Sequence, residues 1–196
     1  MKGSLIIIAF FALGIVVGLQ SSTFNFQFST FILCALMFFV GISIGSDTNT
    51  LKSFRSVNPR LMMLPVMTIF GTLAGTAAAS ALLPHRHLFD CLAIGSGFGY
   101  YSLSSIFITE YKGAELGTIA LLANIMREII TLLCAPLLVK FFGKLAPISM
   151  GGATTMDTTL PIITRTSGQD YVIVSIFHGF CVDFSVPFLV TFFCSL

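Results

Sequence analysis

Asp157 is an acidic residue inside a stretch, 150–165, whose composition is otherwise that of a membrane-embedded segment. Placing an ionised carboxylate at bilayer depth costs about 2.5 kcal/mol or more, so such acids face a bundle interior, a partner or a water-filled cavity. Asp157 therefore indicates either a transport site for a cation or a proton, or a structural ion pair. Arg127 is the candidate partner for such a pair. Both interpretations remain open at this level.

The stretch 150–165 is too short for a continuous span, because crossing ~30 Å of hydrocarbon takes about 20 helical residues. Gly151 and Gly152 loosen its start, and Pro161 interrupts the helical pattern. If the chain is helical there, Pro161 leaves the main-chain oxygen of Asp157 without its usual N–H partner. We therefore predict a broken or re-entrant segment. Its threonines can satisfy freed backbone groups or bind a polar ligand; they include Thr154, Thr155 and Thr158.

A second glycine-rich stretch lies within the apolar segment 88–109, where the sequence reads GSGFGYYSLSSI. Its three glycines weaken a helix. This density predicts an unwound stretch near mid-membrane, as in transporters whose sites are built from broken helices. The alternative is a flexible packing surface with tyrosines at the membrane interface. The residues that carry this prediction are Gly95, Gly97, Gly99, Tyr101 and Ser102.

The apolar segment 117–142 carries three polar residues around its middle: Asn124, Arg127 and Glu128. Asn124 and Glu128 are four residues apart and share one helix face, whereas Arg127 points about 100° away from Glu128. A lone charge at this depth is costly, so both charged residues must face protein or water. Direct ligand contact and a structural salt-bridge network are equally compatible with this pattern.

Asp183 is the acid of the last apolar segment, about 171–195. It stands four residues before Pro187, the spacing that also separates Asp157 from Pro161. A proline at that distance frees the acid's own carbonyl in a helix. Asp183 is therefore a further candidate for the substrate or proton site, ranked below Asp157.

Composition places the whole chain in a membrane. Of its 196 residues, 56% are hydrophobic and only 9% are charged. We predict an all-α polytopic membrane protein forming a single transporter domain over 1–196, with no soluble domain and with a transporter-like repeat architecture. The expected segments, about seven in number, cover roughly 4–19, 29–45, 59–83, 88–109, 117–142, 150–165 and 171–195.

The same composition argues against several other classes of protein. A net charge of +2, scattered along the chain, gives no case for nucleic-acid binding. Its cysteines show no metal-ligand spacing, and no catalytic spacing of Ser, His or Asp is present. We expect no enzyme, no cofactor and no metal. The cluster of Lys52, Arg55 and Arg60 predicts a cytoplasmic loop, hence a cytoplasmic amino terminus and an external carboxyl terminus.

Four motifs in this order resemble the LysO family of bacterial lysine exporters, from about Leu33 to the end: SGFGYYSLSSI, NIMREII, MGGATTMDTTLPIITR and IFHGFCVDFSVPFL. The resemblance implies export of L-lysine and its toxic analogues across the bacterial cytoplasmic (inner) membrane. By the same resemblance, Asp157 matches the family's intramembrane aspartate. Arg127 with Glu128 matches its Arg-Glu pair, and Tyr101 with Ser102 matches its glycine-aromatic motif.

Partners follow from the resemblance and from the chemistry of lysine. Single-chain family members carry further amino-terminal membrane segments, so we expect a small companion membrane subunit or a homo-oligomer. Asp157 and Glu128 suit the cationic end of lysine, and backbone N–H groups near Gly151 or at the GSGFG break suit its carboxylate. We expect proton antiport, with Asp157 holding lysine and a proton in turn. The alternatives are a transporter of another small solute, or a non-transporting membrane assembly subunit.

Overall fold

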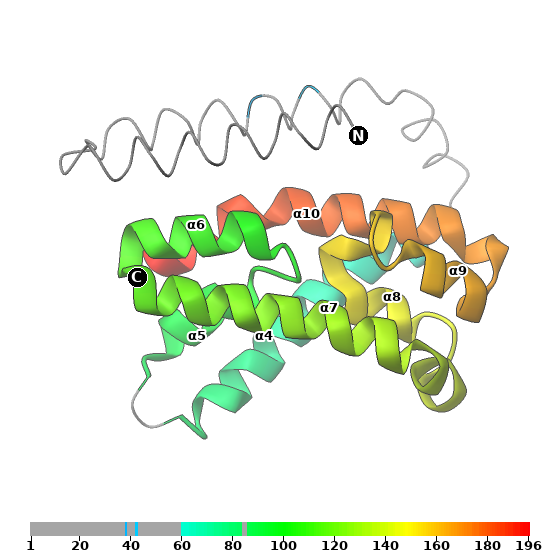
Figure 1. Cartoon of the computed structure of the whole chain (residues 1–196), viewed down its shortest axis with the longest axis horizontal. Coiled ribbons are helices and arrows are strands. Elements are labelled where there is room, and N and C mark those ends of the chain that lie inside the picture. The colour runs from blue at the N-terminus through cyan, green and yellow to red at the C-terminus, as the bar shows by residue number, and fades with distance from the viewer. Residues whose placement is uncertain (1–37, 39–41, 43–59, 84–85) are drawn as a thin grey trace, which may run out of the picture. The chain divides into compact units, whose positions relative to one another are not determined.

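The structure is a computed structural model that describes residues 38, 42, 60–83 and 86–196. The chain divides into two units, Met1–Thr48 and Asn49–Leu196, and the account below concerns the second. Within the described residues every regular element is a helix, which confirms the all-helical class for that part of the chain (Figure 1). The predicted segment 4–19 and nearly all of 29–45 lie outside the described residues, as do Lys52 and Arg55.

Three stretches of the described chain are long and apolar enough to cross a membrane: Leu61–Ser80, Ala114–Phe142 and Gln169–Cys194. They match three of the predicted segments, whereas 88–109 and 150–165 are divided into shorter helices. In chain order the elements are η1 (Leu61–Met63), α4 (Leu64–Ser80), α5 (Leu88–Gly95), α6 (Tyr101–Lys112), α7 (Ala114–Phe142), α8 (Ala146–Gly151), η2 (Gly152–Met156), α9 (Leu160–Ser167), η3 (Gln169–Tyr171) and α10 (Val172–Cys194).

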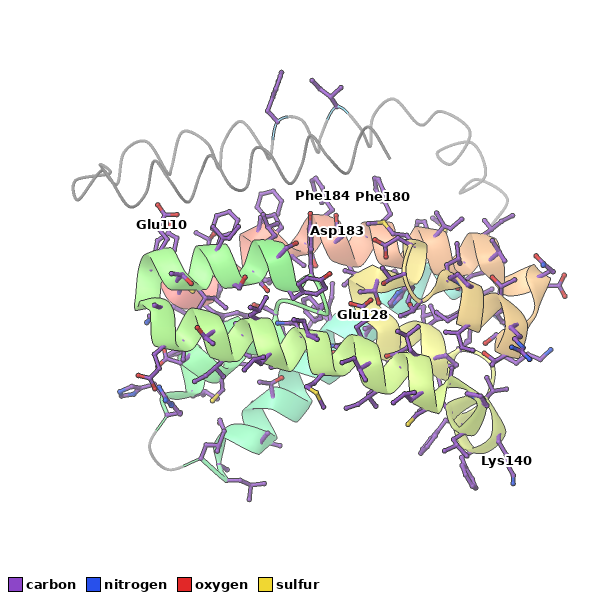
Figure 2. All side chains as sticks on the ribbon, in the orientation of Figure 1. Glu110, Glu128, Lys140, Phe180, Asp183 and Phe184 are labelled. Atoms are coloured by element: carbon purple, nitrogen blue, oxygen red, sulfur yellow. The ribbon has the colours of Figure 1, made fainter. Side chains whose placement is uncertain are left out.

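Helix α10 is largely apolar, with His178 and Asp183 as its main polar exceptions, and its two faces differ in side-chain size. It packs against α5, α6 and η2. Small valines on the inner face allow this close approach, and phenylalanines project from the outer face, as Phe184 does in Figure 2. A helix that is hydrophobic all round belongs in a core or a membrane. The buried residues include Val182, Val186 and Val190, and the exposed ones include Phe184, Phe188 and Phe192.

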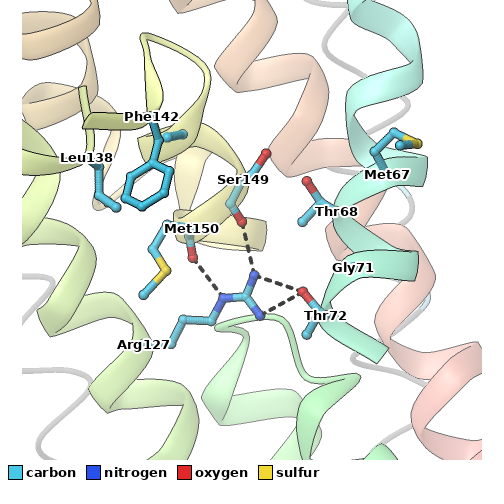
Figure 3. Close-up of a pocket in the computed structure, with 10 residues that line it drawn as sticks. Met67, Thr68, Gly71, Thr72, Arg127, Leu138, Phe142, Ser149 and Met150 are labelled. Carbon is cyan, nitrogen blue, oxygen red and sulfur yellow. Dashed lines mark hydrogen bonds between the residues drawn. The ribbon is translucent and has the colours of Figure 1, made fainter. Parts of the chain in front are cut away.

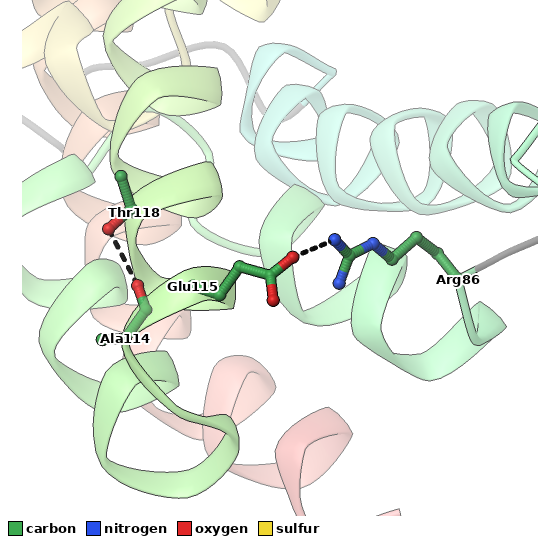
Figure 4. A network of polar contacts seen from close by, with 4 residues as sticks. All are labelled: Arg86, Ala114, Glu115 and Thr118. Atoms are coloured by element: carbon green, nitrogen blue, oxygen red, sulfur yellow. Dashed lines mark hydrogen bonds and ion pairs between the residues drawn. The ribbon is translucent and has the colours of Figure 1, made fainter.

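Helices α6 and α7 form a hairpin that turns at Gly113 and packs along its length. Helix α7 begins at Ala114, three residues before the predicted start. Its first turn carries Glu115, which accepts a hydrogen bond from Arg86 in the loop before α5 (Figure 4). This hydrogen bond and the charge of Glu115 raise the pKa of the Arg86 guanidinium above its ordinary value. The ion pair thus links the start of α7 to that loop.

Candidate functional site

The first helix break separates α5 from α6 at residues 96–100. Asn124 of α7 occupies the gap: its Oδ1 accepts the N–H of Gly99 at 2.8 Å, and its Nδ2 donates to the carbonyl of Ile94 at 3.3 Å. The same Nδ2 donates to Ala120 of its own helix at 2.9 Å. One amide therefore satisfies backbone groups that the break leaves open, since a buried N–H or carbonyl without a partner costs free energy.

The second break lies between α8 and α9, where the chain forms the short 3-10 helix η2. Gly152 adopts a φ of +64°, in the left-handed region that favours glycine. This turn brings the N–H of Ala153 to the carbonyl of Phe98 in the first break, where it donates a hydrogen bond of 2.9 Å. A Cβ on Gly152 would lie 2.1 Å from that carbonyl oxygen. The two breaks therefore meet in direct backbone contact.

A cavity of about 170 Å³ opens beside this crossing. Three carboxylates border it: Glu128 from α7, Asp157 from the second break and Asp183 from α10. Figure 2 labels Glu128 and Asp183. Asp183 is only 6% exposed, whereas Asp157 is exposed and accepts the N–H of Thr158 at 2.5 Å. Of the described residues that line the cavity, none is basic. The other polar lining residues are Tyr100, Tyr101, Ser102, Thr154 and Thr158.

The charges of Asp157 and Asp183 repel each other across this space. A cation or a proton between them relieves that repulsion. The acids are spread around the cavity: within the described part of the chain, no three His, Cys, Asp or Glu side chains are placed to hold a metal ion. The volume is below the roughly 300–1,000 Å³ of pockets for drug-sized ligands. The arrangement suits a small organic cation with more than one polar end.

The family profile described as lysine exporter LysO matches residues 7–194 of this sequence. The chain belongs to this lysine exporter family. The protein named lysine exporter LysO of Escherichia coli K12 is 35% identical over 184 residues, and the putative lysine exporter of Haemophilus influenzae Rd is 34% identical over 165 residues. The family assigned from the four motifs is thereby confirmed. No solved structure matches the chain.

The chain and its relatives within the lysine exporter family differ in how much of each is aligned. The Escherichia coli match covers 92% of this chain but 60% of that protein, so the chain spans about three fifths of this relative. The Haemophilus influenzae match covers 84% of this chain and 83% of that protein. The activity of the whole Escherichia coli protein is therefore only proposed for this chain.

The structure gathers one group of the predicted site residues around the cavity and leaves a second group outside its lining. The first group consists of Gly99, Tyr101, Ser102, Glu128, Thr154, Asp157, Thr158 and Asp183. The second group consists of Gly95, Gly97, Asn124, Arg127, Gly151, Gly152, Thr155 and Pro161. Glu128 lines the cavity and Asn124 fills the first break. Arg127 lies outside the cavity lining but also next to the breaks, because its guanidinium is 5.9 Å from the ring centroid of Phe98.

Arg127 forms no ion pair with Asp157 in the described structure, which argues against the alternative of a structural pair between these two residues. Its Nε donates to the carbonyl of Met150 at 2.8 Å and its Nη2 to that of Ser149 at 3.1 Å (Figure 3). Both nitrogens of its fork also reach the hydroxyl of Thr72 on α4, at 3.3 and 3.4 Å. A cation at the last carbonyls of a helix is stabilised by the helix dipole. Arg127 therefore compensates the carboxyl end of α8.

The freed carbonyl expected at Asp157 also fails, because the segment is not helical from 157 to 161. Pro161 is the second residue of α9, where its missing N–H has no intrahelical acceptor to lose. The carbonyl of Asp157 accepts the N–H of Leu160 at 3.3 Å. For Asp183 the prediction applies, since Pro187 lies inside α10 and cannot donate to it.

Thr155, one of the threonines expected to satisfy freed backbone groups, forms a buried hydrogen-bonded relay with His178. The Thr155 hydroxyl lies 2.8 Å from the carbonyl of Gly152, 2.9 Å from that of Ser175 and 3.2 Å from Nδ1 of His178. Nε2 of His178 lies 2.9 Å from the hydroxyl of Thr68 on α4. Because Thr155 has one hydroxyl hydrogen, which a carbonyl takes, we assign the proton to Nδ1. The relay ties η2 to both α10 and α4.

The remaining glycines allow close packing around the breaks. A Cβ on Gly95 would lie 2.4 Å from Oγ1 of Thr76, and one on Gly97 would lie 2.5 Å from Nδ2 of Asn124. A Cβ on Gly151 would lie 2.6 Å from the Thr155 methyl group. These positions determine how closely the breaks pack, and their effect on the cavity is indirect.

Arg127→Lys is expected to lower the free energy of unfolding in detergent by about 2 kcal/mol, because an ammonium cannot serve two carbonyls and a hydroxyl at once. Lysine binding should stay unchanged, since Arg127 lies outside the cavity lining. Equilibrium unfolding and competition by unlabelled lysine measure the two effects. A loss of lysine affinity of 10-fold or more at unchanged stability would indicate that Arg127 contributes to the substrate site.

Proposed function

We propose that the chain forms the substrate site of an L-lysine exporter in the cytoplasmic membrane of a bacterium. The observation that carries the proposal is the cavity at the crossing of the two breaks, bordered by Glu128, Asp157 and Asp183 and by no basic residue among those described. Lysine brings two ammonium groups to such a site. Membership in a family described by lysine export supports this choice of cation.

We also propose that lysine leaves in exchange for a proton. Moving one positive charge outward against an inside-negative potential costs about 2.3 kcal/mol per 100 mV, and an incoming proton cancels that cost. Asp157 is the acid that we assign to the exchange, because it borders the cavity with an exposed side chain and belongs to a broken segment. Lysine analogues with the same charges would use the same path.

The test is efflux of labelled lysine from loaded proteoliposomes, measured with and without a lower pH outside. We expect efflux to accelerate severalfold with the acidic exterior, because each exported lysine then draws a proton inward. An efflux rate that does not change with the pH gradient would contradict proton exchange but not lysine export. Absence of lysine efflux in every condition, including those with a companion present, would favour another solute or a non-transporting assembly subunit.

The companion membrane subunit is tested in the same vesicles. We propose that a small partner supplies further helices, and the motivation is the longer Escherichia coli relative, of which this chain covers 60%. Efflux should then require both proteins. Full activity of this chain in vesicles that hold it alone would overturn the companion, and crosslinking of the reconstituted protein would show whether copies of the chain take its place.

A further inference from the structure

The start of α6 carries backbone N–H groups that have no acceptor. Helix α6 begins at Tyr101, directly after the first break, and the preceding residue provides no side-chain cap. The N–H of Tyr101 donates to Gly99, and that of Ser104 donates to Tyr100. Between them, the N–H groups of Ser102 and Leu103 find no hydrogen-bond acceptor among the described residues. Such a helix start attracts anions through these groups and the helix dipole.

Asp183 indicates that the same cavity also attracts a positive charge. Its side chain is 6% exposed, and no described residue forms a hydrogen bond or an ion pair with its carboxylate. A buried carboxylate without a partner is strongly unfavourable, so it calls for a cation or a proton from the cavity. Ser102 and Asp183 both border this cavity.

We propose that the cavity takes an amino acid in one orientation, with the α-carboxylate on the free N–H of Ser102 at the start of α6 and an ammonium group on Asp183. This inference rests on the proposed function and specifies which class of cation the site selects. Acidic residues alone would accept any diamine. The helix start adds a requirement for a carboxylate, so the site distinguishes a basic amino acid from the diamine of the same length.

The first experiment uses the unaltered protein and three competitors against labelled lysine: lysine, lysinamide and 1,5-diaminopentane. We expect lysinamide and 1,5-diaminopentane to compete at least 10-fold more weakly than lysine, since each lacks the carboxylate. Equal competition by 1,5-diaminopentane would overturn the carboxylate site and leave lysine export standing. Absence of lysine binding and efflux would instead overturn the proposed function, so the two failures are distinguishable.

The second experiment removes one N–H group by proline. Three of the described helices carry proline as their second residue, namely Pro65 in α4, Pro147 in α8 and Pro161 in α9. Ser102 occupies that position in α6, so Ser102→Pro deletes the N–H at a position where helices tolerate proline. We expect lysine affinity to fall about 10-fold, the equivalent of roughly 1.4 kcal/mol, while affinity for 1,5-diaminopentane stays the same.

Two controls separate the N–H from other effects of that substitution. Ser102→Ala removes the hydroxyl but keeps the N–H, so Ser102→Pro must weaken lysine binding more than Ser102→Ala does. Glu115→Pro places a proline at the second residue of α7, away from the cavity lining, and should leave lysine affinity unchanged. Equal losses for both ligands in folded Ser102→Pro would contradict the proposal. If Ser102→Pro does not fold, the competition by lysinamide and 1,5-diaminopentane on the unaltered protein tests the carboxylate site.

Discussion

Asp183→Asn is expected to weaken lysine binding strongly, and lysine efflux with it, while leaving the protein at least as stable as the wild type. The carboxylate is buried and borders the cavity without a described partner. Its charge is therefore a cost to the folded protein that only a bound cation or proton offsets. Asparagine removes the cost and the attraction together. Loss of a charged hydrogen bond of about 1.5–3 kcal/mol corresponds to roughly a 10- to 100-fold loss of affinity.

The measurement pairs lysine efflux from proteoliposomes with the unfolding midpoint of the purified protein. Asp157→Asn should also lose efflux and its response to a pH gradient, because the group proposed to carry the proton is gone. Glu115→Gln is the matched control, an acid-to-amide change at an exposed residue outside the cavity lining, and it should transport normally. Wild-type efflux by Asp183→Asn would show that the buried acid takes no part in transport, and a large drop in its unfolding midpoint would contradict the unpartnered charge.

Gly152→Ala is expected to destabilise the protein by about 4 kcal/mol or more, in the range that single substitutions seldom reach. Two costs add at this position. The φ of +64° is unfavourable for a residue with a Cβ, and that Cβ would lie 2.1 Å from the carbonyl oxygen of Phe98. Because the obstacle is backbone, no side-chain rotation relieves it. The hydrogen bond from Ala153 to Phe98 must therefore break or shift.

Gly168→Ala is the control that separates these two costs. Gly168 has a φ of +107°, and a Cβ there would meet nothing within 4 Å. Its replacement should cost only about 1 kcal/mol, from backbone conformation alone. Equilibrium unfolding of the two variants in the same detergent gives the difference. Equal losses would mean that the approach of the two breaks contributes nothing to stability.

The sequence predicted the class of fold and the position of the breaks because both depend on local properties. Apolar runs and glycine clusters are visible without any tertiary contact, and so is the face that Asn124 and Glu128 share on α7. The function of each polar residue was harder to predict. Arg127 was the candidate partner for a structural ion pair with Asp157. Its guanidinium instead contacts Ser149 and Met150 at the end of α8.

The contacts that the sequence could not predict depend on which helices cross. Asp183 was ranked below Asp157, and nothing local shows that both acids border one cavity. The argument from Pro161 assumed a helix through 157–161, whereas η2 ends at Met156 and α9 begins at Leu160. Thr68 lies within hydrogen-bonding distance of His178 although the two residues are 110 positions apart. The histidine itself was the only local signal for that contact.

The negative charge around the cavity has a consequence for the proposed coupling between proton entry and lysine export. With its carboxylates ionised and no basic described residue beside them, the unloaded cavity is the least favourable state of the site. Under the proposed exchange of lysine for a proton, this repulsion would oppose the return of an empty site, because it is relieved only when a positive charge occupies the space. Slippage, the return of an unoccupied carrier, would then be suppressed by the same three acids that are proposed to bind lysine.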